Sequence, residues 1–177
     1  MQLDSNSNYF ELFGLPQRFN VDGQTLVERY REMQQQLHPD KFASRPDAER
    51  RWSLQAASLV NDAYRTLQTD LSRAAYLLKL QGIELDEETD TQMDPMFLME
   101  QMELREELES VEQADDCLAR LAGIRKQLRL SVVEQSKAFA AAVEQSDWTL
   151  ARTITRQWQF LDKLQRETKS IEERLDA

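Results

Sequence analysis

The sequence has few cysteine, histidine, glycine and proline residues. One of the 177 residues is cysteine and one is histidine, so the chain can form no internal disulfide and no Cys/His zinc site, which needs about four ligands. Four glycines and four prolines leave little material for tight turns, while 31% of the residues are charged. Because Leu, Gln, Glu, Arg and Ala dominate, we expect an all-α protein. We also expect no intrinsic metal or cofactor.

Long apolar runs are also missing. No stretch approaches the roughly 20 apolar residues that a membrane span needs, and the N-terminus lacks the basic and apolar segments of a secretory signal. The 41% of residues that are hydrophobic still suffice for a buried core. We therefore expect a soluble, cytoplasmic protein with no membrane partner.

Basic residues are scarce in one part of the chain, whose net charge is −10 overall. Residues 1–80 carry 10 Lys or Arg against 10 Asp or Glu, while residues 81–177 carry 12 against 22. Between Glu84 and Asp116 there are 14 acidic residues and one basic residue, Arg105. Such a surface repels phosphate backbones and argues against nucleic acid as a partner. The uneven charge indicates two units with different partners.

A His-Pro-Asp tripeptide, residues 38–40, separates two amphipathic patterns. Pro39 has no amide hydrogen and disfavours the α region at His38, so a helix before it must end there. The patterns on either side predict antiparallel helices with facing apolar stripes. The first stripe consists of Leu26, Tyr30, Met33 and Leu37, and the second of Trp52, Ala56, Leu59, Ala63 and Leu67. We expect the tripeptide to form a polar loop at the tip of this hairpin, although an ordinary turn has the same composition.

The predicted helices form two domains. Residues 1–82 contain a short aromatic helical turn, the hairpin, and a fourth helix that Asp70 can cap and Gly82 can end. Residues 83–94 are acidic, carry no helical stripe and are interpreted as a linker. Residues 95–177 predict a bundle, and a plain coiled coil is the alternative. Its helices are expected at about 95–113, 115–144 and 147–175, the last with a core face of Leu150, Ile154, Trp158, Leu161, Thr168, Ile171 and Leu175.

The first helix of this bundle has apolar residues on two faces. Its buried stripe, whose members lie within about 40° of Phe97 on a helical wheel, consists of Phe97, Leu104, Leu108 and Val111. Apolar and acidic residues share the remaining surface, namely Leu98, Met99, Met102, Glu103 and Glu106. Methionine repacks against varied shapes and glutamate steers basic surfaces, so this face is a candidate protein-binding site. Phe160 lies off the core stripe of the last helix and can extend the face, unless a third helix covers these residues.

Four sequence blocks also occur in a recognisable order. They are residues 9–16 (YFELFGLP), 38–43 (HPDKFA), 73–78 (RAAYLL) and 97–108 (FLMEQMELREEL). Together they resemble the HscB-type J-domain co-chaperones of bacterial iron-sulfur cluster assembly, and the resemblance covers nearly the whole chain. It implies an N-terminal J-domain joined to a C-terminal three-helix bundle.

The resemblance further implies a co-chaperone with two protein partners that is not itself an enzyme. Such proteins stimulate ATP hydrolysis by an HscA-type heat-shock chaperone and deliver the IscU-type iron-sulfur scaffold to it. The chaperone-binding residues carried over from the family are His38, Pro39, Asp40, Arg31, Arg29 and Lys41. The scaffold-binding residues carried over are Leu98, Met99, Met102, Glu103, Glu106 and Phe160.

Two positions depart from the family pattern. Ser110 stands where a further carboxylate of the scaffold face is expected, and Asp70 replaces the proline usual between the third and fourth helices. One alternative is a general J-domain co-chaperone that delivers other clients, for which a broad apolar groove is expected. An enzyme that uses His38 and Asp40 as an acid–base pair is disfavoured, because no nucleophile elbow or phosphate-binding glycine loop accompanies them.

Overall fold

The computed structural model describes residues 7–85, 95–111, 114 and 116–175, and every regular element in these ranges is helical. The all-α prediction is therefore confirmed. The chain divides into two compact units, Met1–Leu80 and Gln81–Ala177. Residues 86–94 of the predicted linker and residues 112–113 of the predicted first bundle helix lie outside the described ranges. Within those ranges, no helix is both long enough and apolar enough to span a membrane.

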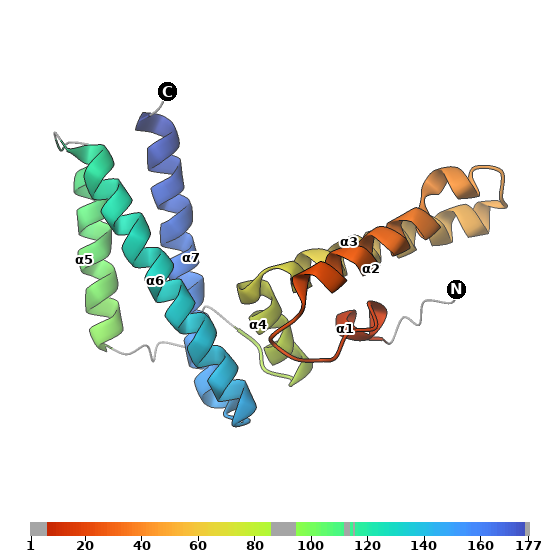
Figure 1. Cartoon of the computed structure of the whole chain (residues 1–177), viewed down its shortest axis with the longest axis horizontal. Coiled ribbons are helices and arrows are strands. Elements are labelled where there is room, and N and C mark those ends of the chain that lie inside the picture. The colour runs from red at the N-terminus through yellow and green to blue at the C-terminus, as the bar shows by residue number, and fades with distance from the viewer. Residues whose placement is uncertain (1–6, 86–94, 112–113, 115, 176–177) are drawn as a thin grey trace. The chain divides into compact units, whose positions relative to one another are not determined.

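The first unit is built around a helical hairpin. Its elements are α1 (Tyr9–Leu12), α2 (Gly23–Leu37), the 3-10 helix η1 (Pro39–Phe42), α3 (Asp47–Gln68) and α4 (Asp70–Leu80). Figure 1 shows α2 and α3 side by side, with η1 at the end of the hairpin remote from α1 and α4. The predicted N-cap of α2 is confirmed, because the Asp22 carboxylate accepts a hydrogen bond from the Gln24 amide at 3.1 Å. At the other end His38 adopts an extended ψ of 128°, as expected before proline.

The apolar stripes of the hairpin form its core. The buried residues are Leu26, Met33 and Leu37 on α2, and Ala56, Val60, Ala63 and Leu67 on α3. The prediction of Leu59 as a core residue is wrong, because Leu59 is half-buried and Val60 is fully buried. These neighbours lie about 100° apart on the helix, and the position of α2 decides which of them faces the core. Tyr30 is also half-buried and stacks on Tyr64 with ring centroids 4.0 Å apart.

A buried arginine joins α4 to the rest of the first unit. Arg73 is only 6% exposed. Its Nε donates to the Phe19 carbonyl at 2.6 Å and its Nη1 donates to the Leu67 carbonyl at 2.5 Å. Its Nη2 pairs with Asp70, which is the first residue of α4, and the Thr69 hydroxyl accepts from the amide of the first helical turn at Ser72. The prediction that Asp70 caps α4 is wrong: the Thr69 hydroxyl accepts the Ser72 amide, and Asp70, which is already inside the helix, neutralises the buried arginine.

The N-terminal aromatic turn packs on α4. Asn8 forms a capping box with Glu11, which is why so short a helix as α1 is ordered. The amide of Tyr9 donates to the Tyr76 hydroxyl at 2.9 Å, and the two rings stack with centroids 4.5 Å apart. Burial raises the pKa of the Tyr76 hydroxyl above its ordinary value. Helix α4 then ends before Gly82, whose φ of 74° favours glycine, as predicted.

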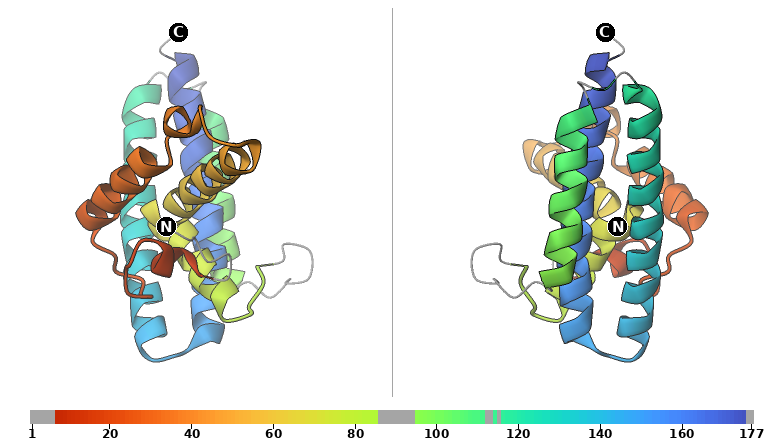
Figure 2. Two further views of the ribbon diagram at one scale, coloured as in Figure 1. Left: turned by 90° about the vertical axis from the view of Figure 1, so that its right-hand side faces the viewer. Right: turned by 90° about the vertical axis from the view of Figure 1, so that its left-hand side faces the viewer.

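The second unit is a bundle of three helices, α5 (Pro95–Val111), α6 (Cys117–Glu144) and α7 (Trp148–Leu175). A tight turn joins α6 to α7, where Ser146 has a left-handed φ of 57° and the Asp147 side chain accepts from the Leu150 amide at 2.9 Å. Figures 1 and 2 show that α5 runs along the part of the α6–α7 pair remote from this turn. The core residues shared by the three helices are Leu104, Leu108, Val111, Leu121, Ile124, Leu128, Leu161, Leu164 and Ile171.

The core face predicted for α7 is correct at most positions. Ile154, Trp158, Leu161, Thr168 and Ile171 are buried, and Leu175 is half-buried. The prediction for Leu150 is wrong, because its side chain is 47% exposed while Ala151 is fully buried. The first turn of α7 follows directly on the tight turn at Ser146, and there the small side chain of Ala151 occupies the interior position.

Candidate partner-binding sites

The His-Pro-Asp tripeptide lies at the exposed tip of the α2–α3 hairpin. It forms a turn of 3-10 helix in place of the loop that we expected. The Nδ1 atom of His38 accepts a hydrogen bond from the Asp40 amide at 3.3 Å, and the carbonyl of His38 accepts from the Lys41 amide at 3.0 Å. Pro39 occupies the first position of η1, where its fixed φ suits the turn and its missing amide hydrogen is not needed. Local hydrogen bonds and the fixed φ of Pro39 therefore hold the conformation of the tip.

The carboxylate of Asp40 is exposed at this tip. Its side chain is 89% exposed, and its Oδ2 lies 3.5 Å from the Nδ1 atom of His38. The same nitrogen accepts the Asp40 amide hydrogen, and most of the carboxylate surface faces solvent. The acceptor capacity of the carboxylate thus remains available to a group outside the chain.

The three basic residues predicted to support the tip are all exposed. Lys41 belongs to η1 itself, whereas Arg31 and Arg29 lie further back on α2. The Arg29 guanidinium forms an ion pair with Glu32 at 3.3 Å, which reduces the positive charge at that point. Phe42 packs against Trp52 with ring centroids 6.0 Å apart, which fastens η1 to α3. Only Lys41 therefore lies beside the tripeptide, and the two arginines lie further back on α2.

One face of α5 is exposed to solvent, and we call it the Met/Glu face. It consists of Leu98, Met99, Met102, Glu103 and Glu106. Met99 and Met102 are each 63% exposed and Leu98 is 39% exposed. Glu103 and Glu106 are exposed beside them. No described helix of the bundle covers these side chains, so the alternative that a third helix buries them does not hold within the described residues. An apolar face of this kind on a charged helix is a feature of protein-binding sites.

Phe160 connects this face to α7. Its ring meets the ring of Phe97 edge to face, with centroids 6.2 Å apart, and it is partly buried against the bundle core. The wheel placed Phe97 in the buried stripe, and it is half-buried. The contact brings Phe160 next to the helix residue that precedes Leu98, as expected if α5 and α7 are neighbours.

Met96 is a member of the exposed face that our reading of the sequence missed. It is 70% exposed and lies about 60° from Met99 on the wheel. A wheel begun one residue earlier would have included it. Ser110, where a carboxylate was expected, donates to the Glu107 carbonyl at 2.8 Å and lies 3.5 Å from the Arg120 guanidinium of α6.

These features define the class of the protein. A helical hairpin that presents an ordered His-Pro-Asp turn, followed in the chain by a separate helical bundle, is the architecture of a J-domain co-chaperone with its own C-terminal domain.

Comparisons with known proteins identify the family. The family of the HSCB C-terminal oligomerisation domain matches residues 93–169. The co-chaperone protein HscB homolog of Vibrio cholerae is 44% identical over 168 residues, which cover 95% of this chain and 98% of the relative. The chain belongs to the HscB family of co-chaperones.

Two solved structures show the same fold. Chaperone HscB from Vibrio cholerae is similar with a TM-score of 0.86 and 43% identity, covering 96% of this chain and 99% of that one. The human co-chaperone protein HscB is similar with a TM-score of 0.89 and 36% identity, covering 96% of this chain and 84% of that one. The similarity therefore extends over both units.

Proposed function

We propose that this chain is a cytoplasmic adaptor for iron-sulfur cluster maturation and transfer. It stimulates ATP hydrolysis by an HscA-type heat-shock chaperone and delivers the IscU-type scaffold to that chaperone. The observation that carries the proposal is the presence of two exposed and chemically different sites, one on each compact unit. One is a turn that exposes a carboxylate, and the other is an apolar face bordered by carboxylates.

The tip acts on the chaperone. The exposed Asp40 carboxylate accepts a charge-assisted hydrogen bond from a basic group of the ATPase domain, a contact worth about 1.5–3 kcal/mol. His38 and Pro39 hold the turn that orients this carboxylate, while Lys41, Arg31 and Arg29 attract an acidic surface. The contact biases the chaperone toward the conformation that hydrolyses ATP. The chemistry takes place in the partner, so the chain needs no catalytic residue.

The α5 face binds the scaffold. Leu98, Met99 and Met102 provide apolar contact area, which Met96 and Phe160 extend at its edges. Glu103 and Glu106 orient a basic partner surface by charge. A scaffold held on this face is present at high effective concentration wherever the tip is bound, which increases its capture by the chaperone.

The experiment that tests the proposal is a single-turnover assay of ATP hydrolysis by an HscA-type chaperone. The reaction is followed with this protein, with the IscU-type scaffold, with both and with neither. We expect this protein alone to raise the rate of ATP hydrolysis. With the scaffold also present, we expect the increase in rate to exceed the sum of the two separate increases. A rate that the scaffold does not raise further would contradict the adaptor function.

A denatured model protein, added in place of the scaffold, tests the more general J-domain co-chaperone. The structure offers a narrow Met/Glu face in place of the broad groove such a protein needs, so we expect the denatured protein to give no comparable increase. Equal increases with the two clients would favour general client delivery.

A further inference from the structure

A groove between α6 and α7 is positively charged, although the second unit as a whole is negatively charged. Its volume is about 260 Å³, and its lining consists of Leu128 and the polar residues Arg125, Arg129, Gln165, Lys169 and Glu172. Three of these are cations and one is an anion, in a stretch of chain, residues 81–177, with 12 basic and 22 acidic residues. All six come from α6 and α7, so the groove is distinct from the Met/Glu face of α5.

The first half of α6 supplies two of the three cations of the groove, Arg125 and Arg129. Between Cys117 and Val133 there are four basic residues and no acidic one, namely Arg120, Arg125, Lys126 and Arg129. Alternating signs along exposed helix faces are usual because they add stabilising pairs within the helix. This half of α6 cannot form such pairs with itself, so its cations are available to groups on other elements or other molecules.

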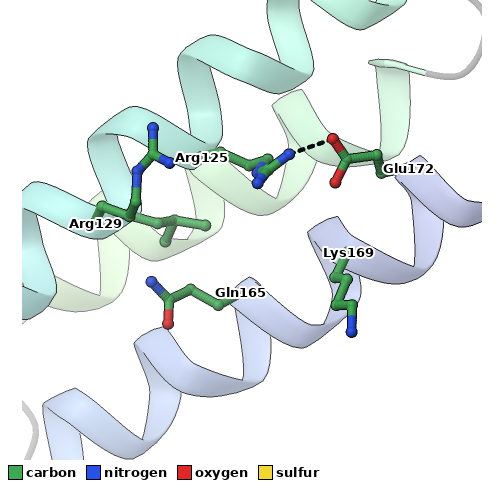
Figure 3. A pocket seen from close by; sticks show the side chains of 6 residues that line it. Arg125, Arg129, Gln165, Lys169 and Glu172 are labelled. Atoms are coloured by element: carbon green, nitrogen blue, oxygen red, sulfur yellow. Dashed lines mark hydrogen bonds and ion pairs between the residues drawn. The ribbon is translucent and has the colours of Figure 1, made fainter.

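Only part of that charge is neutralised across the groove. Figure 3 shows the ion pair between Arg125 of α6 and Glu172 of α7, which joins the two helices. In the same view the guanidinium of Arg129 and the ammonium of Lys169 point away from each other on opposite sides of the groove. No ion pair of Arg129 is found among the described residues, and its side chain is exposed. Lys169 pairs with Glu173 at 3.6 Å, outside the groove lining, and both side chains are largely exposed.

This geometry excludes a compact anion as the natural occupant. A phosphate or free carboxylate is bound where donors converge on one point, and the cations here diverge. Between them lie Leu128, which is 1% exposed, and the aliphatic stems of the long basic side chains. The groove therefore has an apolar floor with positive charges along its two edges.

We propose that this groove binds a short polypeptide segment in which an apolar residue is flanked by acidic residues. The apolar side chain packs mainly on the basic stems, because Leu128 is already buried, and the flanking carboxylates pair with Arg129 on one edge and Lys169 on the other. From Gln165 to Glu172 the groove spans about 10 Å, which three or four extended residues cover. Val133, one helical turn beyond Arg129, is 49% exposed and extends the apolar contact. The proposal does not depend on the identity of the chaperone or the scaffold.

The test uses the full-length protein and a fluorescein-labelled octapeptide of sequence EDELLDED. A second peptide, EDEGGDED, has the same charge without the apolar centre. Fluorescence anisotropy gives the Kd, and backbone NMR shifts locate the binding site. The informative variant is Arg129→Glu, and its matched control is Lys126→Glu, which makes the same change of charge at an exposed α6 position outside the groove lining.

We expect EDELLDED to shift the resonances of the groove residues and to bind about tenfold more tightly than EDEGGDED, since one buried leucine side chain contributes about 1.5 kcal/mol or more. Arg129→Glu should weaken binding about fivefold, and Lys126→Glu less than about twofold. Equal loss in both variants, equal affinity for both peptides, or shifts confined to other surfaces would each overturn the proposal. So would displacement of the peptide by inorganic phosphate beyond the effect of sodium chloride at the same ionic strength, because that result indicates a compact anion site.

Discussion

The two units differ most in how much apolar surface they leave exposed. Among the described residues, the first unit leaves a single large hydrophobic side chain exposed, that of Leu54. The second leaves eight: Met96, Leu98, Met99, Met102, Leu118, Leu130, Val133 and Leu150. The first unit therefore offers a partner direction and charge, through one carboxylate on an ordered turn. The second offers contact area, which tolerates more variation in the position of any one side chain.

This difference predicts how the two sites respond to mutation. A site that depends on one oriented charged group should fail when that group is changed, and it depends on the core that orients it. A site that depends on apolar area should weaken in steps as side chains are shortened. Four changes test this contrast, and the first should have the strongest effect.

Arg73→Met should destabilise the first unit by about 3 kcal/mol. The change leaves the carbonyls of Phe19 and Leu67 without their buried donor, and each such loss is worth about 1–3 kcal/mol. Hydrogen exchange should show reduced protection in α2, α3 and α4 and unchanged protection in α6 and α7. The control, Arg65→Met, changes an exposed arginine of α3 and should shift stability by less than about 0.5 kcal/mol. Equal loss of protection in both units would show that they do not unfold separately.

Asp40→Asn should reduce chaperone stimulation about 10- to 150-fold, the equivalent of a 1.5–3 kcal/mol contact. The side chain is 89% exposed, so neither the unfolding free energy nor the Kd for the scaffold should change. Single-turnover ATP hydrolysis, calorimetric unfolding and scaffold titration measure the three quantities. Asp62→Asn, at an exposed position of α3, is the matched control and should stimulate normally. Full stimulation by Asp40→Asn would reject the assignment of the tip.

Replacing Met99 and Met102 together with alanine should raise the Kd for the scaffold about tenfold, with each single replacement giving a smaller increase. Both side chains are 63% exposed, so stability and scaffold-free stimulation should be unaffected. Titration calorimetry against the scaffold gives the Kd. A paired control, Leu118→Ala with Leu130→Ala, removes exposed apolar side chains from α6 and should leave the Kd unchanged. An unchanged Kd for the methionine double variant would remove α5 from the scaffold site.

The smallest effect concerns pH and the start of α2. The Thr25 hydroxyl, together with the Gln24 amide, donates to the Asp22 carboxylate and lowers its pKa below the ordinary 3.8. Because the folded-state pKa is the lower one, the stabilisation is complete above the unfolded-state value of 3.8 and is lost as the pH falls through the folded-state value. Asp22→Asn keeps a capping oxygen that does not titrate. The stability difference between wild type and this variant, from urea unfolding, should therefore be constant near neutrality and shrink below pH 3.8. A difference that is independent of pH would contradict this role.

The helices of the fold could be predicted because local signals mark their ends. Asp22, Pro95 and the Ser146-Asp147 pair each begin or end a helix through groups within a few residues. The errors at Leu59 and Leu150 have a different origin. Periodicity identifies the side of a helix that faces the core, but which of two adjacent residues is buried depends on the neighbouring helix.

The same distinction between local signals and the packing of neighbouring helices applies to the candidate sites. A wheel of one helix separated Met99 and Met102 from the buried stripe, but it left open whether a third helix covers them, and only the packing of the bundle shows that they are exposed. Arg73 could not be recognised as buried because its acceptor at Phe19 lies 54 residues away in the chain. The α6–α7 groove was likewise not visible, since Arg125 and Glu172 are 47 residues apart and only the packing of two helices brings them together.

An adaptor must carry the tip and the Met/Glu face on the same chain, and a mixing experiment can test this requirement. Asp40→Asn protein and the Met99→Ala, Met102→Ala protein are combined in equal amounts with the HscA-type chaperone and the scaffold, and single-turnover ATP hydrolysis is measured. Each variant is impaired at the site that the other retains. An adaptor predicts that the mixture gives no more scaffold-dependent gain in rate than the methionine variant alone, whereas wild-type protein at the same concentration gives the full gain. Recovery of the wild-type gain by the mixture would show that the two sites can act from separate chains, which an adaptor does not allow.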